Sequence, residues 1–141
     1  MVNVRLVERI LADIKSNTEA LRQADDISWE VYQHDIRNRR FVERSLHIMT
    51  EAVIDIGQHI ISDNKLREPD SYRDTFVVLA ENGIIDKVSL PVYEKMAAFR
   101  NLIVHYYERI DDEIVFGIFQ RNLGDFDKFV KEITNYLRCE Q

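Results

Sequence analysis

The sequence predicts an all-α fold, a four- to five-helix antiparallel bundle in which residues 1–141 form one domain. The chain has only four Gly and two Pro, fewer than many short strands joined by turns need. Apolar residues recur at steps of three and four along most of the chain, which is the period of an amphipathic helix. No alternating polar and apolar run is long enough to indicate a sheet. We therefore expect helices joined by short connections.

The first two predicted helices span residues 2–24 and 28–61. The first has a single apolar stripe and should pack on one face only. Ser28 is a suitable N-cap for the second. The apolar surface of this second helix is wider than one stripe, because Phe41 and Ile48 add to its periodic positions. We expect it at the centre of the bundle, with one face left for a partner.

A shorter third helix follows a predicted loop over residues 64–69. Asp70 or Ser71 can cap this helix, which should run through Leu79 and stop at Asn82–Gly83. Glycine favours that end because it tolerates the left-handed conformation that often follows a helix.

Two helices make up the rest of the chain. Ser89 and Pro91 are typical of the cap and first turn of a fourth helix, over residues 92–107. A long last helix should begin after Asp111 or Asp112 and continue to about residue 137. It contains two weak points, Gly117 and Gly124.

Composition excludes several classes of protein. The single cysteine, Cys139, cannot form an intramolecular disulfide, and no apolar run approaches the ~20 residues of a membrane span. We expect a cytoplasmic protein without a membrane anchor. The net charge of −6 argues against a broad basic surface for duplex nucleic acid, although it allows a local RNA site.

A basic cluster lies near the start of the second helix, and a further arginine, Arg109, follows the fourth helix. The cluster consists of Arg37, Arg39, Arg40 and Arg44. We take Arg37, Arg40, Arg44 and Arg109 as candidate RNA contacts, since arginines bind phosphates. A solvated charged face or a set of ion pairs is the more common use of such residues.

One stretch of the fourth helix, Arg100-Asn-Leu-Ile-Val-His-Tyr-Tyr107, has the residue types of phosphodiester chemistry. Arginine supplies a permanent cation with a fork of donors for phosphate, and histidine can take or give a proton near neutral pH. Arg100 would stabilise phosphoryl charge, and His105 would be the base or acid in metal-independent RNA cleavage. Taken alone, the spacing is also compatible with Arg100 in a surface ion pair and His105 at a helix C-terminus.

Helix geometry constrains this pair. Five positions correspond to ~140° of rotation and ~7.5 Å of rise, so Arg100 and His105 do not share a face, whereas Arg100 and Tyr107 do. Either the helix ends or turns near His105, or two copies of the chain meet so that both supply residues to one cleft. The second alternative predicts a homodimer.

The motif and its position resemble those of a known family. Arg100-Asn101-x3-His105-x-Tyr107 resembles the R-x4-H-x-Y motif of HepT-type toxins in the HEPN superfamily. The segments 41–57 and 99–107 resemble the family's second helix and active-site helix. The resemblance covers nearly the whole chain.

The resemblance implies a HEPN-like homodimer that cleaves RNA without a metal or other cofactor, as the toxin of a type VII-like toxin–antitoxin pair. Arg100 and His105 of both protomers would face a shared cleft, with Asn101 orienting the catalytic groups or the phosphate. Tyr107 matches the tyrosine to which an MntA-like nucleotidyltransferase antitoxin adds AMP, and the added bulk and negative charge would block the site.

Other functions remain open at this point. A non-catalytic dimeric module that binds and regulates a nucleotidyltransferase, or binds nucleotide, has the same fold. A scaffold without a site is a third alternative. A metal site is not indicated, because His34, His47 and His59 are 13 and 12 residues apart. Glu43, Glu51 and Asp55 are interpreted as the polar side of a helix.

Overall fold

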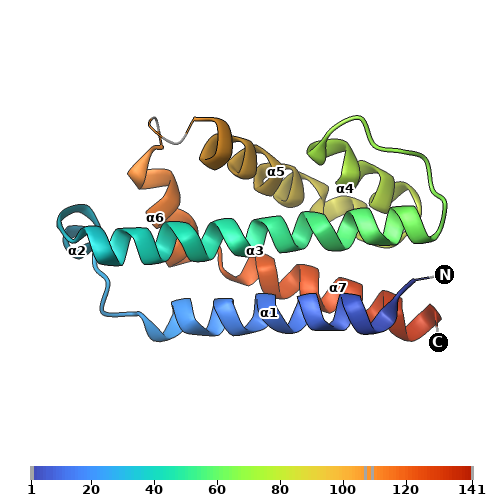
Figure 1. Cartoon of the computed structure of the whole chain (residues 1–141), viewed down its shortest axis with the longest axis horizontal. Coiled ribbons are helices and arrows are strands. Elements are labelled where there is room, and N and C mark those ends of the chain that lie inside the picture. Colours follow the sequence, from blue (N-terminus) through green and yellow to red (C-terminus); the bar gives the residue numbers. More distant parts are fainter. Residues whose placement is uncertain (1, 107, 109, 141) are drawn as a thin grey trace.

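The computed structural model describes residues 2–106, 108 and 110–140, and its long central helix organises the rest. This helix, α3 (Ile36–Asp63), crosses the middle of the molecule and contacts helices on two opposite sides (Figure 1). On one side lie α1 (Val4–Gln23) and α7 (Gly124–Glu140). On the other lie α4 (Tyr72–Glu81), α5 (Leu90–His105) and α6 (Asp112–Arg121). The position expected for the longest helix is therefore confirmed.

The all-α class is confirmed, since the described residues contain helices and no strand. No described helix is both long enough and apolar enough to span a membrane. Two further elements of the described residues are short: α2 (Trp29–His34), and a 3₁₀ turn, η1 (Lys87–Ser89), that leads directly into α5.

Two of the predicted helices are divided. The helix expected over 28–61 is interrupted at Asp35, whose backbone is extended (φ −110°, ψ 104°) and whose carboxylate accepts from the N–H groups of Arg37 and Asn38. Aspartate caps a new helix well, so α3 begins there and α2 turns aside. Ser28 caps α2 as predicted.

The second division falls in the last predicted helix. The chain leaves α6 at Asn122, and α7 begins two residues later at Gly124. Leu123, between them, is buried in the core. Of the two glycines named as weak points, Gly124 marks the break, whereas Gly117 continues within α6.

Caps set most of the remaining boundaries. Ser71 caps α4 and Asp111 caps α6, as expected from the sequence. Gly83 has φ +70° after α4, where its N–H and that of Ile84 bond to carbonyls in the last turn. Ser89 does not cap α5 with its side chain. Instead, Asp86 caps the preceding 3₁₀ turn, so the approach to α5 begins three residues earlier than predicted.

The core holds α5 firmly where it passes α4 and α7. The rings of Phe76, Tyr93 and Phe129 are fully buried and touch one another, with centroids 5.5–6.4 Å apart. Such aromatic contacts fix geometry as well as burying area. The first half of α5 is therefore anchored, and its second half extends along α3 in the opposite direction (Figure 1).

We expect Gly57→Ala to lower the free energy of unfolding by about 1–2 kcal/mol, because α3 and α4 approach closely there. An added Cβ would lie 2.9 Å from the methyl carbon of the buried Thr75. Gly124→Ala is the control, since nothing lies within 4 Å of its added Cβ. It should be neutral or stabilising through helix propensity. Urea denaturation of both variants measures the difference, and a Gly57→Ala variant as stable as Gly124→Ala contradicts the close approach.

Candidate active site

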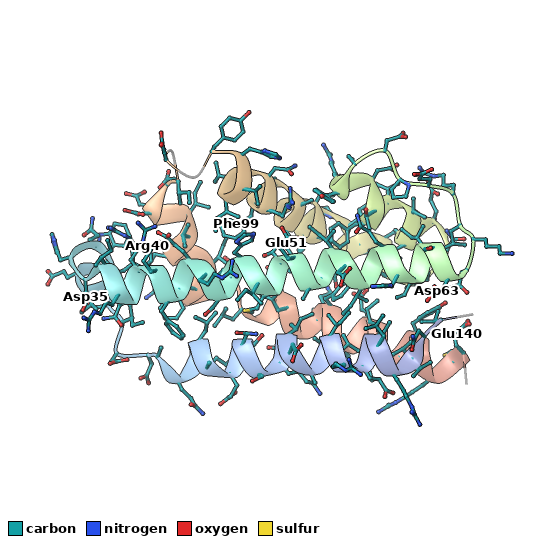
Figure 2. The ribbon with its side chains drawn as sticks, in the orientation of Figure 1. Asp35, Arg40, Glu51, Asp63, Phe99 and Glu140 are labelled. Atoms are coloured by element: carbon teal, nitrogen blue, oxygen red, sulfur yellow. The ribbon has the colours of Figure 1, made fainter. Side chains whose placement is uncertain are left out.

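Arg100 is held between three helices. Its Nε donates a 2.8 Å hydrogen bond to Oε1 of Glu51 on α3, and its Cζ lies 4.4 Å from the ring centroid of Tyr72 at the start of α4. The side chain is only 14% exposed. Figure 2 shows Glu51 near the middle of α3, where α5 passes. Arg100 is therefore a largely covered cation. It forms an ion pair with the 42% exposed Glu51, so the ion-pair alternative from the sequence agrees with the structure.

The same carboxylate oxygen has a second neighbour. Nε2 of His47, one turn earlier on α3, lies 3.4 Å from Oε1 of Glu51. The His47 side chain is 25% exposed and that of Glu51 is 42% exposed. Glu51 thus lies between a histidine of its own helix and the arginine of α5.

His105 lies at the end of the helix. It is the last residue of α5, and Tyr106 closes the helix with an N–H bond of 2.9 Å to the carbonyl of Leu102. His105 and Asn101 are exposed, whereas Arg100 is largely covered. The sequence offered a helix end near His105 as one alternative, and the described residues have that end. It leaves His105 accessible without turning it onto the Arg100 side of α5.

Tyr107 and Arg109, the predicted modification site and one predicted RNA contact, lie outside the described residues. Tyr106, just before them, is 55% exposed.

The basic cluster at the start of α3 is partly engaged within the protein. Arg40 and Arg39 lie 3.7 and 3.9 Å from the Glu43 carboxylate, and Arg39 also donates to the carbonyl of Gln33. The Glu43 side chain is buried, and this burial raises its pKa against the opposing effect of the two arginines. Arg37, Arg40 and Arg44 are all exposed, so each could reach a phosphate, although Arg40 also lies beside the Glu43 carboxylate.

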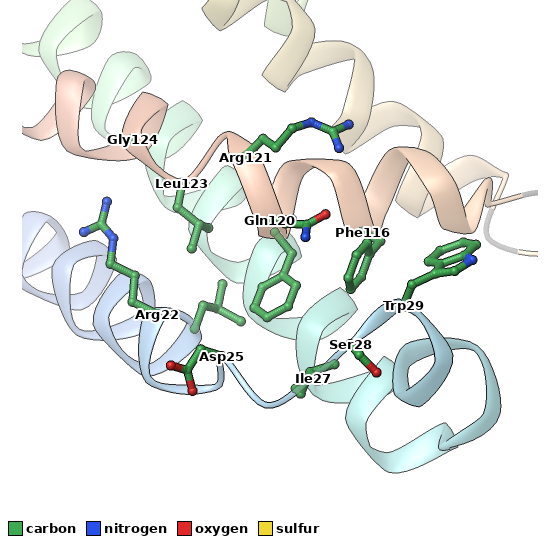
Figure 3. A pocket seen from close by; sticks show the side chains of 12 residues that line it. Arg22, Asp25, Ile27, Ser28, Trp29, Phe116, Gln120, Arg121, Leu123 and Gly124 are labelled. Atoms are coloured by element: carbon green, nitrogen blue, oxygen red, sulfur yellow. The ribbon is translucent and has the colours of Figure 1, made fainter.

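One cavity borders the motif: a hollow of about 560 Å³ has Leu102 of the motif stretch on its wall, together with Phe99 of α5 and Ile118 of α6. A cavity of about 750 Å³ lies between the ends of α1 and α6, with Arg22, Trp29 and Phe116 on its wall (Figure 3). None of its lining residues belongs to the stretch from Arg100 to His105. A smaller hollow of about 360 Å³ is lined in part by Glu51 and Tyr72, the residues that hold Arg100.

Within the described residues, no group of three or more His, Cys, Asp or Glu side chains is placed to hold a metal ion. His47 and His59 each approach a carboxylate one turn away on α3, Glu51 and Asp55 respectively. These are pairs within one helix.

Sequence reasoning identified Arg100 but missed what holds it. Glu51 was interpreted as part of the polar side of a helix, and Tyr72 was not singled out. Their contacts with Arg100 span 49 and 28 positions of the chain. No local spacing signals such a pair. One hint was available, because Glu51 lies three positions after Ile48, on the side of the predicted central helix left for a partner.

Comparison with known proteins was consistent with this architecture. The family model described as "Ribonuclease HepT-like" matches residues 7–133. The chain is 34% identical over 102 residues to the "mRNA nuclease HepT" of Shewanella oneidensis, covering 72% of this chain and 77% of that protein. It is 29% identical over 141 residues to the "tRNA nuclease HepT" of Aphanizomenon flos-aquae, covering 97% and 95% of the two proteins.

A solved structure agrees in fold. The tri-AMPylated HEPN toxin of Shewanella oneidensis, in complex with its MNT antitoxin, superposes with a TM-score of 0.82 at 31% identity. The match covers 96% of this chain and 99% of that one. A family model that spans most of the chain, relatives of nearly equal length and a shared fold lead to one conclusion. The chain belongs to the ribonuclease HepT-like family of the HEPN superfamily.

Proposed function

We propose that this protein is the endoribonuclease toxin of a type VII-like toxin–antitoxin pair, and that it cleaves RNA without a metal ion in a cleft between two copies of the chain. The observation that carries the proposal is the contrast between two motif residues: Arg100 is a covered, fixed cation, whereas His105 is exposed at the end of the same helix. The names of the relatives, an mRNA and a tRNA nuclease, support an RNA substrate.

The reaction uses both residues. A neutral His105 removes the proton from a ribose 2′-hydroxyl, and the oxygen attacks the adjacent phosphorus. The bond from phosphorus to the 5′-oxygen breaks, that oxygen takes up a proton from water, and a 2′,3′-cyclic phosphate remains. Arg100 stabilises the negative charge that grows on the phosphoryl oxygens, and the exposed Asn101 orients the phosphate.

A second copy of the chain supplies what one copy lacks. His105 is rotated by ~140° from Arg100 about the axis of α5, so one phosphate cannot contact both within one protomer. A two-fold axis beside the end of α5 brings Arg100 of one protomer toward the partner's His105. Two sites related by that axis then share one cleft.

Exposed apolar side chains support the position of this interface. Phe41 and Ile48 lie seven positions apart on one face of α3, and each is 39% exposed. Val104, one turn after Arg100 on α5, is 40% exposed. Because α5 runs opposite to α3 and Arg100 contacts Glu51, Val104 lies toward the Ile48 end of α3. These three residues, which we term the α3–α5 face, are the proposed dimer contact.

Regulation of the toxin is assigned to Tyr107. An MntA-like nucleotidyltransferase transfers AMP from ATP to the Tyr107 hydroxyl, with release of pyrophosphate. The proposal is supported by the tri-AMPylated state of the related Shewanella toxin and by the position of this tyrosine two residues after His105. The added phosphate repels RNA, and the adenosine fills the cleft.

We expect Arg100→Ala and His105→Ala each to lower the rate of RNA cleavage in EDTA at least ~100-fold, because each removes a group that acts in the transition state. Arg138→Ala on α7 and His59→Ala near the C-terminal end of α3 are the matched controls. Both should cleave at the wild-type rate. Wild-type protein without cleavage activity favours a non-catalytic module that regulates a nucleotidyltransferase instead.

We expect Ile48→Glu to raise the dimer dissociation constant more than ~100-fold, because the two-fold axis would bury two like charges that cost several kcal/mol. Val88→Glu is the control. Val88 is also apolar and 83% exposed, but it lies in η1, before the start of α5 and roughly 18 Å along the helix axis from Arg100. Sedimentation equilibrium measures both variants, and an unchanged dimer with Ile48→Glu places the interface elsewhere.

We expect Tyr107→Phe to escape AMP addition by an MNT-type antitoxin and to remain active when the antitoxin and ATP are present. Tyr106→Phe, which alters the exposed neighbour, should still be modified and silenced. Intact-protein mass spectrometry and the cleavage assay measure the two effects. Modification of Tyr107→Phe together with loss of modification in Tyr106→Phe contradicts the assignment.

A further inference from the structure

We infer that Glu51, supported by Tyr72, is a positioning residue for the ribonuclease reaction, and that it fixes the direction in which Arg100 presents its terminal nitrogens to phosphate. The inference rests on the proposed function of Arg100. It goes beyond the motif, because Glu51 and Tyr72 lie on other helices, 49 and 28 positions earlier in the chain.

The contacts divide the guanidinium group into a held part and an available part. Nε donates to Glu51 at 2.8 Å, and Cζ lies over the Tyr72 ring, 4.4 Å from its centroid. Within the described residues, Nε is the only nitrogen of Arg100 that donates a hydrogen bond. The two terminal nitrogens are left to bind phosphate, which they can do as a fork.

An unconstrained arginine side chain loses conformational freedom when it binds phosphate. The contacts of Arg100 restrict that freedom before phosphate binds. An arginine side chain has several rotatable bonds, and the orientation of its plane sets where its donors point. The Nε bond and the ring together restrict both the position and the plane of the group. A cation already in place stabilises transition-state charge without reorganisation at the moment of reaction.

Glu51 is itself constrained. His47 lies 3.4 Å from the same Oε1 atom that accepts from Arg100, so the carboxylate has neighbours on α3 and α5. Asp55, the next acidic residue along α3, pairs with His59 at 3.5 Å in the same one-turn spacing. The two pairs differ in that only Glu51 also holds a residue of the motif.

This difference provides a matched control for the test. Glu51→Ala removes the acceptor, Glu51→Gln keeps an acceptor of the same length without its charge, and Asp55→Asn alters the equivalent pair one turn away. All are made in the full chain, and kcat and KM are measured on a fluorescent RNA oligonucleotide in EDTA. Arg100→Ala is measured alongside.

We expect Glu51→Ala to lower kcat ~100-fold with KM changed less than ~3-fold, because misplacing a transition-state group affects the chemical step more than binding. Glu51→Gln should recover ~10-fold of that loss. Asp55→Asn should match the wild type. Since Glu51 is 42% exposed, the melting temperature of its variants should stay within a few degrees of the wild type.

A second readout does not depend on activity. In ¹H–¹⁵N NMR spectra, the Nε–H resonance of Arg100, assigned by its loss in Arg100→Ala, should be protected from exchange in the wild type and in Asp55→Asn. Glu51→Ala should lose that protection. In one outcome the wild type is active, Arg100→Ala is inactive, and Glu51→Ala matches the wild type in both kcat and Nε–H protection. That outcome overturns the positioning role of Glu51 and leaves the proposed function intact. Inactivity of the wild type overturns the proposed function and this inference with it.

Discussion

The rotation of ~100° per residue along α5 is the constraint on which the geometry of the candidate site depends. Because five positions turn a helix through ~140°, Arg100 and His105 leave α5 in different directions. The core fixes the direction of Arg100, through the buried aromatic cluster that anchors α5 and through the Glu51 and Tyr72 contacts. The end of the helix fixes His105 in an exposed position. The proposed two-fold axis resolves this separation, and we propose the exposed residues of the α3–α5 face as the contact through which it passes.

The central helix α3 connects these features. It packs against α1 on one side and α4 on the other, and its close approach to α4 at Gly57 sets the distance between α3 and α4. Its side toward α5 carries Glu51, which holds Arg100, and His47. Phe41 and Ile48, two apolar residues of the same helix, are exposed. One helix therefore supports the core, holds the candidate cation and carries the face that we propose for contact with a second copy.

Much of the helical fold could be predicted from the sequence, because its signals are local. Periodic apolar residues and the caps Ser28, Ser71 and Asp111 predicted the helical elements, because these signals act within a few residues of the chain. The breaks at Asp35 and Asn122 were missed, since helical periodicity continues across both. At Asp35 the capping carboxylate outweighs that periodicity, while Leu123 is buried between α6 and α7. Arg100 and His105 were identified as candidates from their residue types and from the resemblance to the HepT motif. Glu51 and Tyr72 were missed as partners of Arg100, because their contacts with it are made only by the tertiary fold.

The most direct test of the shared cleft compares two heterodimers in the RNA cleavage assay. One pairs an Arg100→Ala protomer with a His105→Ala protomer, and the other pairs the wild type with a protomer that carries both substitutions. If Arg100 acts with the partner's His105, the first heterodimer keeps one intact site and cleaves at about half the wild-type rate, while the second is inactive. The reverse result, an inactive first heterodimer and an active second, would show that each site lies within one protomer and would contradict the account.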